Sequence, residues 1–207
     1  LAQMTDEVGE LVLRTNYLQT QSMSSAEDAG VAAVEEQGRF MRALERRDRL
    51  DREIEFLPND EDLSDRVAAN KGLTRPEFAV VQSYAKMVLY DDLLASDLPQ
   101  DEYFTDDLIA YFPKQIQRKH LSAITGHSLR REIVATLIAN SIVNRVGATF
   151  INNVMEETGH APADIARAYA AARGVFDFRS LWADISSLDN KVDAAVQTRM
   201  NQASEAL

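Results

Sequence analysis

The chain has 207 residues, 45% of them apolar and 27% charged, which is ordinary soluble-protein composition with room for one large domain or two small ones. A net charge of −11 argues against a nucleic-acid partner, and the absence of cysteine excludes disulfides, zinc–thiolate sites and thiol nucleophiles. The chain begins "LAQMTDEVGE", without an initiator methionine or a signal-peptide pattern, so we expect a cytoplasmic piece of a longer protein.

Helical spacing of apolar residues dominates the first quarter of the chain. An opening helix with one apolar stripe is predicted by Val8, Leu11, Val12 and Leu18. A second helical stretch, residues 26–56, is dense in opposite charges, and Pro58 stops it. Its apolar positions are Phe40, Leu44, Leu50, Ile54 and, just beyond, Leu57. We expect residues 1–58 to form a charged helical arm or hairpin and residues 59–207 to form a helical bundle.

The clearest local signature in the chain is a helix start at residue 75. Thr74 and Glu77 have the spacing of a capping box, and Pro76 lies in the first turn. The buried face of this helix is then predicted to consist of Phe78, Val81, Tyr84, Ala85, Val88 and Leu89.

The second half of the chain is predicted to contain one long central helix. Pro113 separates two short helices, and Gly126 precedes a helix that begins near Ser128 and runs to Gly159, a length of roughly 45 Å at 1.5 Å per residue. Pro162 opens a further helix that Gly174 closes, and two more helices follow in residues 177–189 and 192–202. No strand pattern is present, so the expected fold is an all-α multi-helix bundle.

Residues 133–155, "IVATLIANSIVNRVGATFINNVM", combine an apolar run with several asparagines. The apolar side chains point around almost the whole helix, so protein or lipid must enclose it, and the polar interruptions disfavour lipid. We therefore expect no membrane span. Asn140 and Asn144 fall on a packed face, and we predict that at least one of them is buried and hydrogen-bonded to another helix.

Motifs for catalysis, cofactors or metals are missing from the sequence. No two glycines are spaced as Gly-x-Gly, which excludes a dinucleotide-binding fingerprint. Glu157 and His160 have one metal-ligand spacing, but Gly159 ends the helix between them, so a surface histidine is the favoured interpretation. We assign no catalytic, cofactor or metal residue.

A small anion site is the one binding pattern in the sequence. Arg130 and Arg131, with Lys119 and Arg118 before them, lie near the start of the long helix, where the helix dipole favours negative charge. The alternative is a solvated basic face that balances nearby acids.

Several long stretches resemble one enzyme family. They are "MTDEVGELVLRTNYLQTQ", "RLDREIEFLPNDEDL", "NKGLTRPEFAVVQSYAKMVLYDDLLASDLP", "LRREIVATLIANSIVNRVGATFINNVMEETG" and "LDNKVDAAVQTRM". In this order they are similar to the C-terminal helical region of the large bacterial NAD-specific glutamate dehydrogenases. The resemblance implies a parent enzyme that converts L-glutamate to 2-oxoglutarate and ammonia with NAD. The family's catalytic lysine and aspartate and its nucleotide-binding glycines precede this region, so none is carried over.

Two functional hypotheses follow for the chain itself. In the first, residues 1–207 form a C-terminal domain that packs on the catalytic portion of the same chain, or on a neighbouring subunit of a homo-oligomer, and supports assembly or regulation. In the second, the helices hold a small-molecule effector whose carboxylate binds Lys119, Arg130 and Arg131. In either case we expect no cofactor in these residues, NAD in the parent enzyme, and no dehydrogenase activity of residues 1–207 alone.

Overall fold

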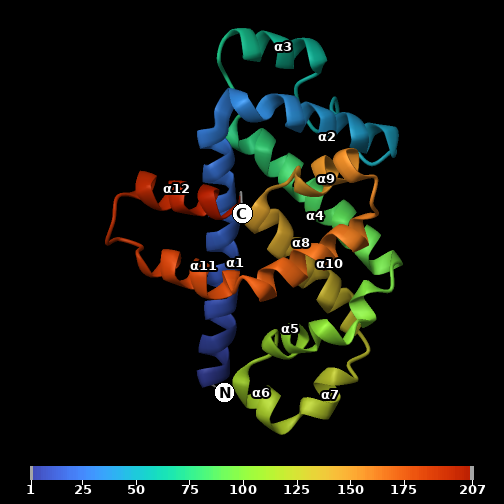
Figure 1. Ribbon diagram of the computed structural model, residues 1–207, viewed down its shortest axis with the longest axis vertical. Helices are drawn as coiled ribbons and strands as arrows, with labels where there is room; N and C mark the ends of the chain where they lie inside the picture. Colours follow the sequence, from blue (N-terminus) through green and yellow to red (C-terminus); the bar gives the residue numbers. More distant parts are fainter. Residues whose placement is uncertain (1, 206–207) are drawn as a thin grey trace.

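A computed structural model describes residues 2–205, and this part of the chain is all-α, with no strand. The first helix, α1 (Ala2–Ala29), is the longest described. It runs along the long axis of the molecule, with α2 (Val34–Arg46) and α3 (Asp60–Ala68) at one end (Figure 1). The predicted fold class is confirmed.

The other elements follow in chain order. A 3-10 turn, Gly30–Ala33, joins α1 to α2. After α3 come α4 (Arg75–Ala95), the 3-10 turns Leu98–Gln100 and Glu102–Phe104, α5 (Thr105–Ala110), α6 (Lys114–Lys119) and α7 (Leu121–Thr125). The last elements are α8 (Arg130–Val146), α9 (Phe150–Thr158), α10 (Pro162–Val175), α11 (Phe178–Ser187) and α12 (Ala194–Glu205). In Figure 1, α5, α6 and α7 lie at the end opposite α3.

The centre of the core is formed by α4 and α8, which pack side by side. The predicted face of α4 is buried at Phe78, Val81, Ala85, Val88 and Leu89, and Tyr84 is half-buried. Phe40, Met41 and Leu44 of α2 belong to the same hydrophobic cluster, so side chains from both sides of residue 58 share one core.

The predicted long central helix is wrong, because two helices replace it. Gly147 ends α8 with φ 97° and ψ 161°, a conformation that is open almost only to glycine. After this break α9 runs at 89° to α8. Gly159 ends α9 in the left-handed conformation, with φ 72°, as predicted, and Pro162 opens α10 as predicted, although α10 continues one residue past Gly174 to Val175.

The bend brings α9 onto α2. The Arg39 Nε donates to the Glu156 carboxylate at 3.1 Å, and the Asn153 Nδ2 donates to the Glu36 carboxylate at 2.9 Å.

Within residues 2–205 no single helix is both long and apolar enough to cross a membrane. The helices α8 and α9 reach the required length and apolar content only when they are counted together, despite the 89° bend between them.

The expected helix over residues 26–56 is also shorter than predicted. It breaks at Gly30, and α2 ends at Arg46, eleven residues before Leu57. The reason is a tight turn in which Asp48 takes a positive φ of 53° and the Arg49 N–H returns to the Leu44 carbonyl. Leu50 and Leu57 are buried beyond this turn, whereas Ile54 is 71% exposed.

Candidate functional site

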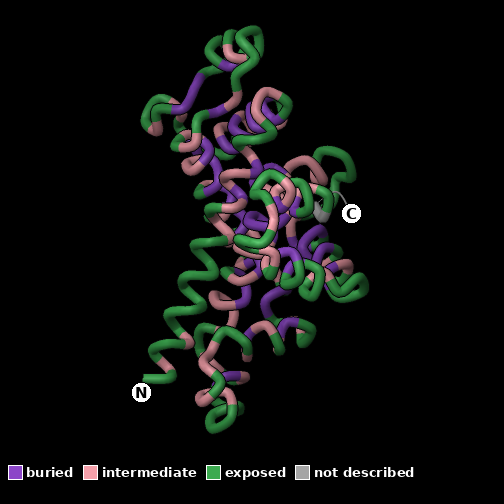
Figure 2. Tube along the Cα trace, turned by 90° about the vertical axis from the view of Figure 1, so that its left-hand side faces the viewer, coloured by how far each residue is buried: buried purple, intermediate pink, exposed green. Residues whose placement is uncertain are grey.

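The N-terminal half of α1 carries an apolar stripe that is about half exposed. Three residues of the predicted apolar stripe, Val8, Leu11 and Val12, are 47%, 41% and 54% exposed. Figure 2 shows this half of α1 exposed along most of its length, and its first turns contact α6, where the Lys114 N–H donates to the Glu7 carboxylate at 2.7 Å.

The direction of the stripe explains its apolar character. At about 100° per residue, Leu11 lies within about 20° of Ser22, whose side chain is buried against the core in the second half of α1. The Ser22 hydroxyl donates to the Val143 carbonyl at 3.3 Å and accepts from the Gln82 Nε2 at 2.9 Å. One face of α1 therefore packs on α4 and α8 in its second half and continues past them, about half exposed, in its first half.

A network of charges holds the start of α4. The helix begins at Arg75, as predicted, and the Glu77 Oε2 accepts from the Thr74 N–H at 2.7 Å and from the Thr74 hydroxyl at 2.8 Å. The Arg66 guanidinium of α3 binds both Glu77 oxygens, at 2.6 and 2.7 Å. Burial alone would raise the pKa of Glu77, but the hydrogen bonds from Arg66 and Thr74 outweigh it and lower the pKa to about 2. The cap therefore also clamps α3 to α4.

Thr74→Ala is expected to lower the free energy of unfolding by about 1 kcal/mol, because the Glu77 carboxylate loses one of its donors while Arg66 and the backbone N–H remain. Thr74→Ser keeps a hydroxyl and should stay within about 0.5 kcal/mol of the parent. Urea denaturation at constant slope measures both. Equal midpoints for the two variants would contradict a role of the hydroxyl.

Arg130 and Arg131 bind carbonyl groups of the chain itself. The Arg130 guanidinium donates to the carbonyls of Pro99 and Asp101, at 3.4 and 3.2 Å. The Arg131 Nη2 donates to the carbonyls of Leu94 and Ser96 at 2.5 and 2.8 Å, at the C-terminal end of α4. The two arginines thus fasten the connection between α4 and α5 to the start of α8.

The third residue of the predicted anion site, Lys119, is exposed at the end of α6 and forms no hydrogen bond or ion pair with any described residue. Over residues 2–205 no group of three or more histidine, aspartate or glutamate side chains is placed to hold a metal ion.

Asn144 is buried, at 7% exposure, and Asn140 is half-buried. The predicted hydrogen bond is missing at the buried Oδ1 of Asn144, which has no partner among the described residues. Asn144 instead lines a small polar cavity of about 10 Å³ together with Ser25 of α1 and Asn201 of α12.

Two buried arginines were missed from the sequence. Arg145 of α8 lies over the Trp182 ring of α11, with the guanidinium carbon 4.6 Å from the ring centroid. Arg173 of α10 pairs with Asp107 of α5 at 2.7 Å. The signal for Arg145 was its position as the single charge in the apolar run of residues 133–155.

Comparison with known sequences gives consistent matches. Residues 70–207, more than half of the chain, match the sequence model of the family described as "Glutamate dehydrogenase, C-terminal". The chain is similar to the NAD-specific glutamate dehydrogenase of Halomonas elongata, with 46% identity over 97% of this chain. It is also similar to the proteins of the same name from Pseudomonas aeruginosa, 44% identical over 95% of the chain, and from Mycobacterium tuberculosis, 32% identical over 88%. The matched region spans only 12%, 12% and 11% of those three proteins.

Proposed function

Because the chain belongs to the glutamate dehydrogenase C-terminal family, we propose that residues 1–207 form a helical domain of a much longer NAD-specific glutamate dehydrogenase. In that enzyme L-glutamate would be converted to 2-oxoglutarate and ammonia with NAD. By analogy with that family, the catalytic and nucleotide-binding residues of the enzyme would lie outside this chain.

The role of the domain would be to pack on the remainder of the parent chain through the first half of α1. The observation that carries this proposal is the stripe of Val8, Leu11 and Val12, which continues the core-facing side of α1 and is about half exposed. Apolar side chains at helical spacing are stabilising only when another surface excludes water from them. The relatives are about eight times longer than the matched region, which leaves ample chain to supply that surface.

The effector hypothesis at Lys119, Arg130 and Arg131 has weaker support. Arg130 and Arg131 direct their donors to the carbonyls of the connection between α4 and α5. A ligand carboxylate would have to displace these hydrogen bonds, and the C-terminal turn of α4 would lose its cap.

The test is a Leu11→Glu, Val12→Glu double variant of the parent enzyme. Burying two unpaired carboxylates in a docked interface is expected to weaken it by several kcal/mol, so the parent should lose thermal stability and glutamate-dependent reduction of NAD. In residues 1–207 alone, which we expect to be inactive, the same changes face solvent and should shift the urea midpoint by less than about 0.5 kcal/mol.

A matched control is Leu13→Glu. Leu13 is 70% exposed and lies about 200° around the helix from Leu11, so this variant should leave the parent enzyme stable and active. The proposal fails if the double variant of the parent keeps its stability and activity, or if Leu13→Glu is equally damaging.

A further inference from the structure

A cavity of about 320 Å³ lies between α2, α4 and the corner formed by α8 and α9. Its wall is apolar, with Phe40 from α2, Val88 from α4, Val143 from α8, and Ile151 and Met155 from α9. A volume of this size falls within the range of small-molecule sites, about 300 to 1,000 Å³. The cavity is remote in sequence from α1 residues 2–17, and nothing in it serves the docking surface.

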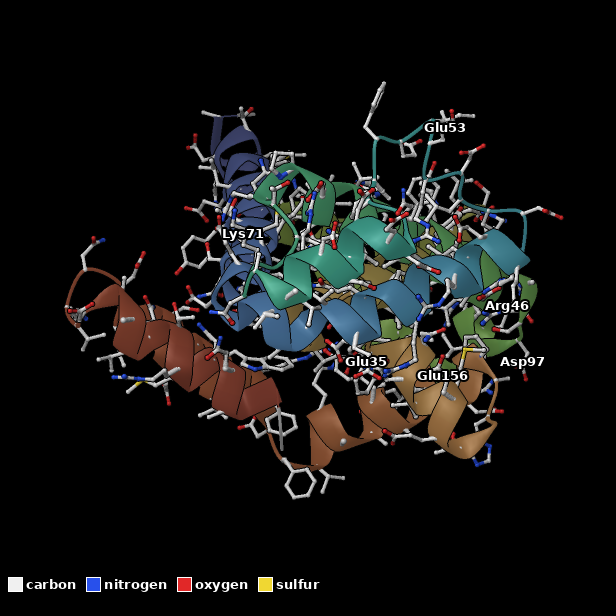
Figure 3. All side chains as sticks on the ribbon, turned by 90° about the horizontal axis from the view of Figure 1, so that it is seen from above. Glu35, Arg46, Glu53, Lys71, Asp97 and Glu156 are labelled. Atoms are coloured by element: carbon white, nitrogen blue, oxygen red, sulfur yellow. The ribbon has the colours of Figure 1, made fainter. Side chains whose placement is uncertain are left out.

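The acidic groups that line the cavity are already neutralised. Asp92 accepts from the Arg47 Nη2 at 2.6 Å, and Glu156 accepts from the Arg39 Nε at 3.1 Å. Arg46, which also lines the cavity, forms no ion pair or hydrogen bond with any residue that the structure describes. Figure 3 shows Arg46 at the end of α2 and Glu156 on α9 along the same edge of the molecule.

The amide of Asn152 does not add a second donor to the cavity. Asn152 of α9 lines the cavity, and its Nδ2 is buried without a hydrogen-bond partner among the described residues. This nitrogen has almost no accessible surface, so it does not face the cavity. The unpaired charge at the cavity is therefore Arg46, which is exposed at its rim and selects a ligand with a negatively charged acceptor.

We propose that this cavity binds a small aliphatic carboxylic acid. The carboxylate would lie at Arg46, at the rim of the cavity, and the apolar chain would lie against Phe40, Val143 and Met155. An alkylammonium ion would be disfavoured by Arg46, and a neutral alcohol would lose the charge-assisted hydrogen bond. The binding requires neither the docking of α1 nor dehydrogenase activity.

The experiment is calorimetric titration of the 207-residue chain with octanoate and decanoate, below the concentrations at which they form micelles. Saturable binding at one site is expected, with 1-octanol binding about 5-fold or more weakly than octanoate and with no binding of octylammonium. Failure of both acids to saturate the chain would overturn the proposal, as would equal binding of octanoate and octanol.

Three variants test whether the acid binds in this cavity. Arg46→Gln should weaken octanoate binding about 10-fold and leave octanol unchanged. Arg14→Gln removes the same charge from exposed α1 and should change neither. Ala43→Phe, at the wall of the cavity, should abolish binding of both ligands while the urea midpoint confirms that the chain is folded. Unchanged octanoate affinity in Arg46→Gln or in folded Ala43→Phe would show that the acid binds elsewhere.

Discussion

Gly147→Ala is expected to lower the free energy of unfolding by about 2 kcal/mol, because Gly147 has φ 97° and ψ 161°, where an L-residue is strained by roughly 1 to 3 kcal/mol. A Cβ at this position would meet no other atom within 4 Å. The penalty therefore comes from the backbone conformation alone, and repacking of neighbours cannot relieve it.

Straightening of α8 into α9 would relieve the strain, but only at the expense of contacts to α2. The Arg39–Glu156 ion pair and the Asn153–Glu36 hydrogen bond both depend on the 89° bend. Either response lowers stability, and urea denaturation of the parent and the variant at equal slope measures the loss.

Gly9→Ala is the matched control for this variant. Gly9 lies in exposed α1 with helical geometry, and a Cβ there also meets no atom within 4 Å. Alanine should therefore be neutral or stabilise the chain by up to about 1 kcal/mol. If Gly147→Ala behaves like Gly9→Ala, the break between α8 and α9 is not fixed by the glycine conformation.

The helix break at Gly147 could not be predicted from the sequence alone. Gly147 stands inside an apolar run, and a single glycine is tolerated within a helix for roughly 1 kcal/mol, so periodicity predicted one helix through it. What decides the break is the packing of α9 on α2, through contacts more than a hundred residues apart, such as Arg39 with Glu156. Helical periodicity contains no information about such a partner.

Short-range signals were more informative. The start of α4 at Arg75 and the end of α9 at Gly159 were predicted because the deciding interactions lie within four residues. The carbonyls bound by Arg131 lie 35 and 37 residues away, so the sequence showed a cation without its acceptors. The stripe at Leu11 was recognised as apolar, but its periodicity could not show that about half of its surface stays exposed.

Glu77→Gln is expected to have the largest effect on stability of the single substitutions. The Glu77 side chain is 15% exposed, and its carboxylate accepts both guanidinium hydrogen bonds of Arg66 and two from Thr74. A fall in the pKa from 4.5 to about 2 corresponds to at most about 3 kcal/mol of stability at neutral pH, and to less where water screens the pair. The glutamine keeps the shape but loses the charge, and it leaves Arg66 with a neutral partner.

The pH dependence separates this charge effect from a loss of packing. Because the folded pKa of Glu77 lies below its unfolded value, its contribution is fully present above pH 4.5 and is lost as the pH falls toward about 2. The difference in free energy of unfolding between the parent and Glu77→Gln should therefore shrink by about half between roughly pH 6 and pH 3. Urea titrations at several pH values measure it.

The control for this series is Glu53→Gln, at an exposed carboxylate that forms no ion pair within residues 2–205 (Figure 3). It should change the free energy of unfolding by less than about 0.5 kcal/mol. A difference between the parent and Glu77→Gln that stays constant from neutral pH to about pH 3 would assign the loss to shape rather than charge. In that case the clamp between α3 and α4 would be a matter of packing around Arg66, and the lowered pKa of Glu77 would contribute little to the stability of the fold.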